Sequence, residues 1–200
     1  MKLLGSIFDT LMNVGVIALI VLFQDEIRRF LLTLGSHRHV SALARLFNGA
    51  KKEVLKHDDI MPVVMACLSM GKQKVGALIV IEHNVPLDEI VRTGEMIDAA
   101  INQRLIENIF FKNSPLHDGA MVISKKRIKA AGCILPVSHD LNIPKELGLR
   151  HRAAMGISQQ SDAHAIIVSE ETGAISVAYR VQFYLRLNAE ELESMLTKEN

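Results

Sequence analysis

An apolar run near the N-terminus constrains this 200-residue chain more than any other feature. Residues 7–23 contain only three polar side chains, those of Asp9, Thr10 and Asn13. A helix needs roughly 20 apolar residues to cross a bilayer, and two leucines before the run bring it to about that length. The sequence therefore predicts a membrane-spanning helix within residues 1–35. The alternative is an apolar helix packed in a soluble core or a dimer interface.

The charges after this run predict its orientation. Residues 24–56 hold seven Lys or Arg and three acidic residues. Because an excess of Lys and Arg marks the cytoplasmic side of a span, we expect the rest of the chain to be cytoplasmic and anchored to the cell membrane. Asp9 lies within the span, where a carboxylate is costly unless it is paired or close to the interface.

Composition and charge exclude several classes of protein. Hydrophobic residues make up 49% of the chain and charged residues 22%, a balance that rules out intrinsic disorder. The net charge of +1, the absence of Trp and the presence of only two Tyr argue against a nucleic-acid partner. Cys67 and Cys133 lie in apolar runs and are expected to be buried free thiols. Two cysteines are too few for a disulfide scaffold or a Cys-based zinc site.

Apolar periodicity predicts helices and strands along the rest of the chain. Residues 36–58 have helical spacing and are expected to connect the membrane helix to a domain at 59–186, which a C-terminal helix and tail at 187–200 follow. Further helices are predicted at 61–70, 101–111 and 189–196, with a turn or short helix at 86–91 and a loop leading into a helix at 148–160. Strands are predicted at 76–81, 120–124, 128–137, 165–169 and 174–178. This alternation predicts an α/β domain with a mixed β-sheet flanked by helices.

Three segments of the domain are unusually polar, and the first is 114–120. It puts His117 and Asp118 on a turn just before a predicted strand, and α/β folds bind ligands in loops at strand ends. Gly119 and Ala120 have almost no side chain, so a ligand could approach the backbone closely. The alternative is a plain turn in which Asp118 caps its own backbone.

The second segment is basic and opens a helix of small residues. Arg150, His151 and Arg152 stand where guanidiniums and helix N–H groups could hold phosphates. The alternative is a solvated helix start paired with acids such as Glu146.

The third segment, 169–173, places two carboxylates on a tight turn after a buried strand. Together with Asp118 they could hold Mg²⁺ or Mn²⁺, which take carboxylate ligands. The alternative is an ordinary acidic hairpin turn. Taken together, the three segments supply what metal-assisted attack on a nucleoside triphosphate requires. Neither a Walker A sequence nor a G-x-G-x-x-G sequence occurs, so the familiar nucleotide folds are not supported.

The motifs in combination resemble the diadenylate cyclase (DAC, or DisA-N) domain. They are DGA at 118–120, RHR at 150–152 and SEETG at 169–173, in that order and with a step of 32 residues from Asp118 to Arg150. Further similar segments are GALIVIE at 76–82, NSPLHDGA at 113–120, AAGCILP at 130–136 and ELGLRHRAAMGIS at 146–158. The similarity covers roughly residues 60–185, so the catalytic domain is expected at 59–186.

The flank FQDEIRRFLLTLG at 23–35 looks like the end of the last membrane helix in the membrane-anchored CdaA type of this family. That type usually has three N-terminal spans, and one is present here, so the chain looks shortened relative to it.

The resemblance implies an enzyme that condenses two ATP molecules into cyclic di-3′,5′-AMP and releases two pyrophosphates. Asp118 would bind a divalent metal, Mn²⁺ or Mg²⁺ with Co²⁺ as a further candidate, and help deprotonate the ribose 3′-hydroxyl. Glu171 and His117 would be further metal ligands. Arg150, His151 and Arg152 would hold the phosphates. Since one domain binds one ATP, the active unit would be a head-to-head homodimer.

The resemblance also implies a set of ATP-binding residues. They are Gly76, Gly119, Ala120, Ile134, Leu135, Leu149, Arg150, His151, Arg152 and Ser169. Leu135 would line the adenine pocket, and Ser169 would contact the phosphate chain. Two positions depart from the family pattern: Leu149 stands where Thr often contacts phosphate, and Ile134 where an aromatic residue, commonly Tyr, often packs on adenine. Neither departure affects the carboxylates or the arginines, so we expect activity with weakened ATP affinity.

Two other functions remain open at this point. A non-catalytic, membrane-tethered nucleotide-binding module could keep the arginines without needing the metal ligands, so Asp118 and Glu171 favour the cyclase. A phosphohydrolase with a His-Asp pair would need a histidine-rich helical core and is disfavoured by the strand content. The resemblance further implies a YbbR-domain regulator and phosphoglucosamine mutase as partners.

Overall fold

The computed structural model describes residues 57–140, 143–144 and 146–197. The membrane helix predicted within 1–35 lies outside these residues, as does the predicted connector apart from its last two positions. Among the described helices, none has the length and apolar character needed to cross a bilayer.

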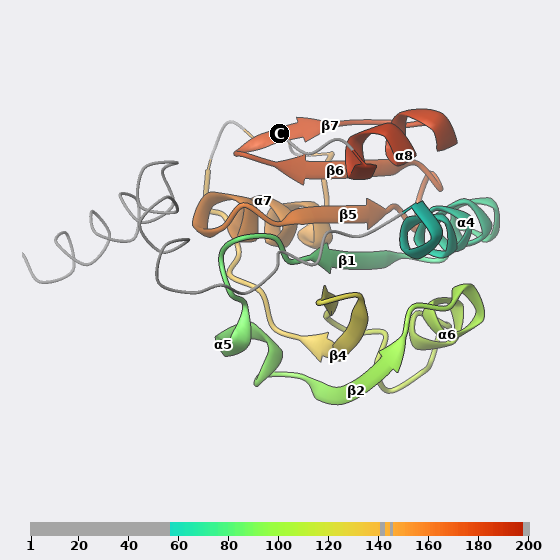
Figure 1. The fold of residues 1–200 in the computed structure, drawn as a ribbon. Helices are drawn as coiled ribbons and strands as arrows, with labels where there is room; N and C mark the ends of the chain where they lie inside the picture. Colours follow the sequence, from blue (N-terminus) through green and yellow to red (C-terminus); the bar gives the residue numbers. More distant parts are fainter. Residues whose placement is uncertain (1–56, 141–142, 145, 198–200) are drawn as a thin grey trace, which may run out of the picture. The chain divides into compact units, whose positions relative to one another are not determined.

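The described part of the chain is built around a mixed sheet of seven strands in the order β2-β4-β3-β1-β5-β6-β7 (Figure 1). The strands are β1 (Ala77–Ile81), β2 (Glu95–Ala100), β3 (Ala120–Ser124), β4 (Arg127–Cys133), β5 (His164–Val168), β6 (Ile175–Tyr179) and β7 (Gln182–Tyr184). β1 pairs in parallel with β3, and all other neighbouring strands are antiparallel. The mixed α/β fold predicted from the sequence is therefore confirmed.

Helices cover both faces of the sheet (Figure 1). One face carries α4 (His57–Gln73), α6 (Gln103–Ile109) and α8 (Ala189–Thr197), and the other carries α5 (Asp88–Val91) and α7 (Leu149–Gln160). Because successive side chains of a strand point to opposite faces, Ile79 packs towards α4, whereas Leu78 and Val80 pack towards α7. All five residues of β1 are buried, which explains its continuous apolar run.

Several element boundaries differ from the prediction. α4 begins at His57, four residues earlier than expected, which places Pro62 inside the helix. β4 ends at Cys133, where its pairing with Ala120 ends, and residues 134–137 leave the strand. Apolar periodicity does not predict β2 and β7, because both lie at the sheet edges and most of their residues are exposed.

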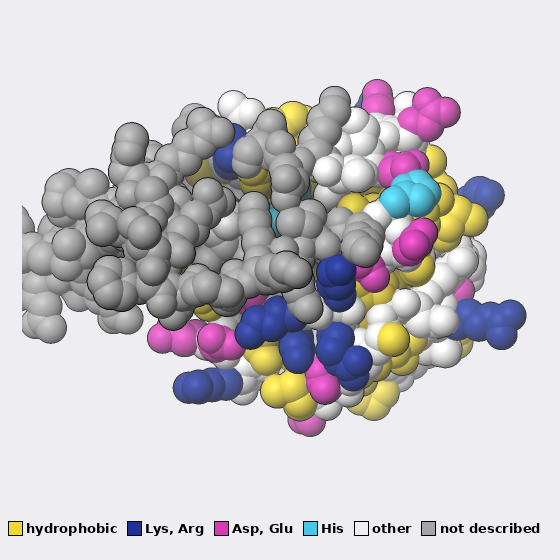
Figure 2. Space-filling model, in the orientation of Figure 1, with side chains coloured by type: hydrophobic (Ala, Val, Ile, Leu, Met, Phe, Trp, Pro, Cys, Tyr) yellow, Lys and Arg dark blue, Asp and Glu magenta, His cyan; other side chains and the backbone are white. Residues whose placement is uncertain are grey.

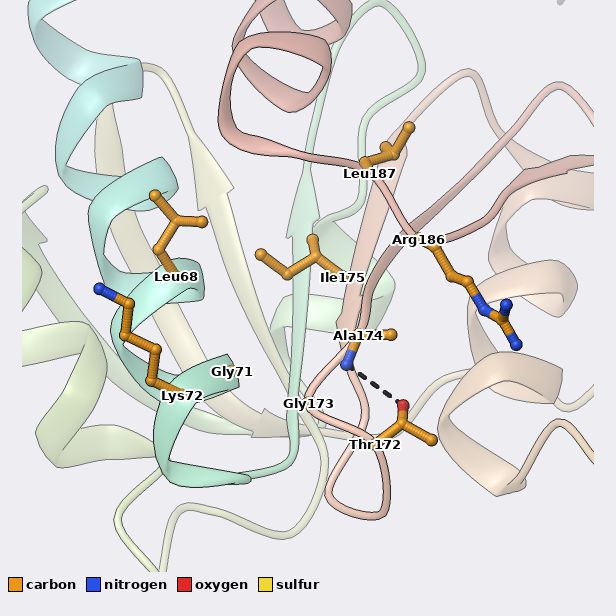
Figure 3. Close-up of a pocket in the computed structure, with 9 residues that line it drawn as sticks. All are labelled: Leu68, Gly71, Lys72, Thr172, Gly173, Ala174, Ile175, Arg186 and Leu187. Carbon is orange, nitrogen blue, oxygen red and sulfur yellow. Dashed lines mark hydrogen bonds between the residues drawn. The ribbon is translucent and has the colours of Figure 1, made fainter.

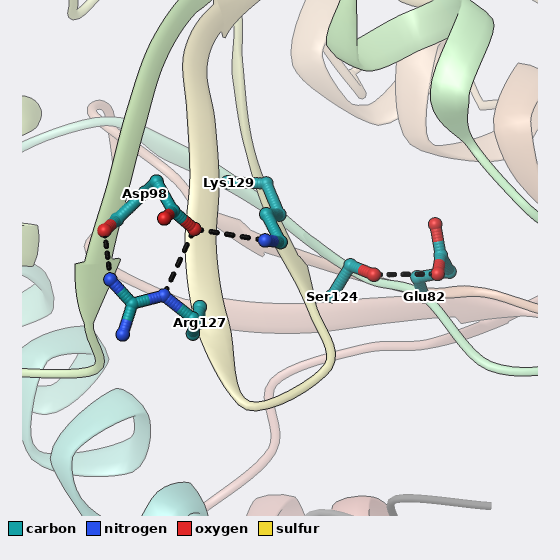
Figure 4. Close-up of polar contacts among 5 residues, drawn as sticks. All are labelled: Glu82, Asp98, Ser124, Arg127 and Lys129. Atoms are coloured by element: carbon teal, nitrogen blue, oxygen red, sulfur yellow. Dashed lines mark hydrogen bonds and ion pairs between the residues drawn. The ribbon is translucent and has the colours of Figure 1, made fainter.

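Charged contacts hold the edge strand β2 against β4 (Figure 4). The carboxylate of Asp98 accepts hydrogen bonds from Lys129 Nζ at 2.8 Å and Arg127 Nε at 2.9 Å, which lower the pKa of Asp98. Lysine and arginine side chains accordingly lie among acidic ones over this part of the surface (Figure 2). Where β1 and β3 end, the Glu82 carboxylate accepts the Ser124 hydroxyl at 2.6 Å (Figure 4).

Candidate active site

The strand order brings the polar segments to one end of the sheet, where strands begin or end. β1 and β3 are parallel, so both begin at this end, just after Gly76 and Gly119. β4 and β5 are antiparallel to them, so both end there. The register confirms this arrangement, since Ala120 lies opposite Cys133 and Ala77 opposite Val168.

Asp118 and His117 lie side by side before β3. The Asp118 carboxylate is 87% exposed, and its Oδ1 lies 3.5 Å from His117 Nε2. His117 Nδ1 contacts the backbone carbonyl oxygen of Ser114, which can only accept, so Nδ1 carries the proton. Nε2, the other ring nitrogen, lies on the side of the Asp118 carboxylate. A histidine held through its other nitrogen in this way is typical of a metal ligand.

The small residues after Asp118 are required by the sheet itself. Gly119 has a φ of +119°, and a Cβ there would lie 2.7 Å from the backbone carbon of Gly132 in β4. Ala120 is fully buried. The glycine therefore allows β3 and β4 to approach closely. That a ligand also approaches the backbone here stays a prediction.

The first turn of α7 carries Leu149 and the three basic residues. Leu149 is 76% exposed. His151 is buried, its ring lies edge-on to Phe183 with centroids 6.0 Å apart, and burial lowers its pKa. Arg152 is half-buried, and its backbone carbonyl accepts the Ser138 amide at 3.0 Å. The contacts of His151 thus pack α7 against β7, and phosphate binding by this imidazole stays a prediction.

Arg150 joins the start of α7 to the end of β5. Its Nη1 lies 2.8 Å from Oε2 of Glu170. A Cβ on Gly76 would lie 2.7 Å from that nitrogen and 2.8 Å from that oxygen. The ion pair therefore lies directly over the backbone of Gly76, at the entry to β1. The sequence predicts Glu170 only as one of the two carboxylates of the acidic turn, and it gives no sign of this ion pair with Arg150. The family resemblance gives a role to its neighbour Glu171 alone.

The acidic turn, residues 169–174, is closed by its own hydrogen bonds. The Gly173 amide donates to the Ser169 carbonyl at 2.8 Å, and the Ser169 amide donates to the Ala174 carbonyl at 3.0 Å. The Ser169 hydroxyl oxygen accepts the Thr172 amide at 3.3 Å. Glu171 is exposed on this turn.

The two residues predicted to meet adenine differ in exposure. Leu135 is nearly buried in the cluster beneath α7, whereas Ile134 is 70% exposed. The Ile134 amide donates to the Thr93 hydroxyl at 2.9 Å, which fixes the backbone where it leaves β4.

The three predicted metal ligands do not form one cluster. Among the described residues, no group of three or more His, Cys, Asp or Glu side chains is placed to hold a metal ion. β3 and β5 lie on either side of β1, so at about 4.8 Å per strand Asp118 and Glu171 start from strand ends roughly 10 Å apart. Asp118 and His117 alone form a ready pair of oxygen and nitrogen donors.

Comparisons with known proteins identify families that match two parts of this chain. The family described as DisA bacterial checkpoint controller nucleotide-binding (DAC) matches residues 64–183, and the CdaA N-terminal transmembrane domain matches residues 1–27. The chain is 40% identical to the cyclic di-AMP synthase CdaA of Bacillus subtilis, over 96% of this chain and 69% of that protein. It is 33% identical to the diadenylate cyclase of Mycoplasma pneumoniae, over 91% of this chain and 92% of that protein.

Two solved structures are similar to this chain in fold. A double mutant of DacA from Staphylococcus aureus matches with a TM-score of 0.68 and 45% identity, over 70% of this chain and 93% of that one. A hypothetical membrane spanning protein from Bacillus cereus matches with a TM-score of 0.63 and 29% identity, over 94% of this chain and 92% of that one. Since the DAC match spans more than half of the residues, the chain belongs to the diadenylate cyclase family.

Proposed function

We propose that this chain condenses two ATP molecules into cyclic di-3′,5′-AMP with release of two pyrophosphates. The observation that supports this most strongly is that the three motifs lie at one end of the sheet, where Arg150 meets Glu170 over Gly76. In each half-reaction a bond forms between a ribose 3′-oxygen and the α-phosphorus of the other ATP. The bond between that phosphorus and the bridging oxygen of pyrophosphate breaks, and the hydroxyl proton leaves to a base.

Phosphate binding is assigned to the start of α7. The guanidinium of Arg150 is already oriented by Glu170, and Arg152 lies one position beyond the buried His151. Arginine binds phosphate oxygens through two parallel hydrogen bonds, and the first N–H groups of the twelve-residue helix add a favourable dipole. These groups would bind the triphosphate and stabilise the charge of the departing pyrophosphate.

Proton transfer and metal binding are assigned to the turn before β3. Asp118 and His117 would hold a divalent cation, Mn²⁺, Mg²⁺ or Co²⁺, and Glu171 would complete its ligands when substrate is bound. Such a cation would polarise the α-phosphate and lower the pKa of the 3′-hydroxyl. The exposed Asp118 carboxylate would accept the hydroxyl proton, directly or through water.

The reaction requires two chains. One domain offers one set of motifs, and each 3′-oxygen must point in line at the other ATP, so we propose a head-to-head homodimer. Exposed Ile134 and Leu149 lie at the site and would face the second nucleotide or the second chain. We further propose that residues 1–35 anchor the chain and that the catalytic domain faces the cytoplasm, where ATP is available. A YbbR-domain regulator and phosphoglucosamine mutase stay predicted partners.

The test uses the full chain reconstituted in membranes with ATP and Mn²⁺ or Mg²⁺. Mass spectrometry should find cyclic di-AMP from the wild type and none from Asp118→Asn, while Asp88→Asn, at an exposed position in α5, should behave as the wild type. ATP that binds without any product would instead support the non-catalytic nucleotide-binding module. Release of mononucleotide or free phosphate would indicate a hydrolase.

A further inference from the structure

The end of α4 touches the acidic turn through two backbones. A Cβ on Gly71 would lie 2.6 Å from the carbonyl oxygen of Gly173, and a Cβ on Gly173 would overlap the carbonyl oxygen of Gly71. Gly173 also has a φ of +74°, which side chains rarely allow. Both positions therefore need glycine for the contact to form.

Gly76 lies beside the Glu170 side chain of the same turn. The carboxylate of Glu170 lies over Gly76, five residues after Gly71. The segment between these glycines has a fixed geometry, because the Val75 amide donates to the Met70 carbonyl at 2.9 Å and Lys74 takes a φ of 53° to end the helix. Residues 71–76 thus meet the turn at two places, the backbone of Gly173 and the side chain of Glu170.

An open pocket of about 560 Å³ lies beside the contact between Gly71 and Gly173, between α4 and the chain that follows β7 (Figure 3). Leu68, Ile175 and Leu187 line this pocket without filling it. Because the acidic turn is closed by its own hydrogen bonds, we expect a displacement of α4 at Gly71 to shift the turn as a unit.

We infer that Gly71 is a positioning residue for the acidic turn, so that the last turn of α4 sets where Glu170 and Glu171 stand relative to Asp118. The inference rests on the proposed function. It gives α4, which directly follows residues 1–56, a mechanical connection to the proposed metal and phosphate site. The connection runs through backbone atoms, so a substitution at Gly71 changes it without removing any functional side chain.

The experiment compares the full-length wild type with Gly71→Ala and with Gln73→Ala, an exposed position in the same helical turn. Alanine favours the helix, so any loss in Gly71→Ala comes from the clash with Gly173. Loss of contacts that support metal ligands typically costs 10- to 100-fold in metal affinity. Mn²⁺ binding is measured from the free Mn²⁺ signal in electron paramagnetic resonance with 3′-deoxy-ATP, which lacks the attacking hydroxyl, and is corrected for the Mn²⁺ that this nucleotide binds without protein. In Gly71→Ala it should weaken by about 10-fold. Gln73→Ala should bind Mn²⁺ as the wild type does. Unchanged Mn²⁺ binding in folded Gly71→Ala would overturn the inference.

A second measurement uses only the wild type and covers the case in which Gly71→Ala does not fold. Hydrogen–deuterium exchange should slow at residues 169–174 on addition of ATP and Mn²⁺. It should also slow at residues 71–75 under the same conditions. Slower exchange at the turn with no change at residues 71–75 would disprove the connection. No change at the turn, with no cyclic di-AMP formed, would instead be a failure of the proposed function.

Discussion

Nη1 of Arg150 and Oε2 of Glu170 lie 2.8 Å apart, and the pair joins the first turn of α7 to the end of β5. The Glu170 side chain is 58% exposed, and an exposed pair of this kind contributes little to stability. The pair instead orients Arg150, because it holds the Arg150 guanidinium over Gly76 before a phosphate binds. Glu170 and Gly76 therefore belong to the proposed phosphate site, although neither needs to touch a phosphate.

Gly76→Ala tests this orientation. The new Cβ would meet the ends of two flexible side chains, so Arg150 and Glu170 should move while the fold stays intact. Loss of a charged hydrogen bond costs about 1.5–3 kcal/mol, which predicts a fall of roughly 10- to 100-fold in kcat/KM for ATP. The melting temperature should change little.

Glu170→Gln provides the matched comparison for Gly76→Ala. Both substitutions act through the same guanidinium, so the double variant should lose no more activity than the more damaging single variant. Losses that multiply in the double variant would mean that Gly76 and Glu170 act independently, which contradicts the positioning of Arg150 by this pair.

The fold was predictable where strands are buried. β1, β3, β5 and β6 are continuous apolar runs with every residue buried, and the predicted bounds of each lie within a residue or two of the observed ones. β2 was missed because its sequence, EMIDAA, is largely exposed and contains Asp98 in a left-handed conformation. Edge strands are specified by contacts with a neighbour, here the Asp98 contacts with Arg127 and Lys129, and a single sequence carries little signal of them.

The candidate site was predictable in its parts but not in its assembly. Each motif contains residues whose chemistry is visible in the sequence, such as Asp118 and Arg150. They meet at one end of the sheet because β1 pairs with both β3 and β5. These two strands lie some forty and ninety residues beyond β1 in the sequence. The roles of Gly71 and Gly76 depend on what fills the space of a missing Cβ, which only the tertiary structure shows.

Gly119→Ala separates a structural role from a ligand-binding role. The substitution puts a Cβ on a residue with a φ of +119° and against the backbone of Gly132. Backbone strain and overpacking each cost about 1–3 kcal/mol, so the free energy of unfolding without ATP should fall by at least this amount. Unchanged stability with a raised ATP KM would show that the glycine serves the nucleotide alone.

The pH dependence of stability should reflect His164. This imidazole is buried, lies against Tyr179 with ring centroids 4.1 Å apart, and its Nδ1 lies close to Nε2 of His83. Burial first, and then the charges of His83 and Arg180 against the opposing charge of Asp162, lower its pKa to about 3. As the pH falls below 6.5, His164 therefore binds a proton in the unfolded chain, whereas in the folded chain it binds one only near pH 3.

The resulting stability is complete above pH 6.5 and is lost as the pH falls from 6.5 towards 3. Each pH unit in this window should lower the free energy of unfolding by about 1.4 kcal/mol through His164 alone. His164→Phe, which can keep the stacking on Tyr179, should remove that slope in denaturant unfolding between about pH 4 and 6. The exposed His139→Gln serves as the control and should retain the slope. An equally steep dependence in His164→Phe would assign the effect to another group.

Leu149→Thr tests whether the departure at the start of α7 weakens ATP binding. Leu149 is 76% exposed beside Arg150, so its replacement should cost little stability. A hydroxyl at this position could donate to a phosphate oxygen, and one such hydrogen bond contributes about 0.5–1.5 kcal/mol, which predicts an ATP KM lowered by roughly 2- to 10-fold. Leu149→Val has nearly the shape of threonine without the hydroxyl and should keep the wild-type KM. If the valine and threonine variants lower the KM equally, the cause is side-chain size. In that case, or if neither variant lowers it, the predicted phosphate contact at residue 149 is wrong.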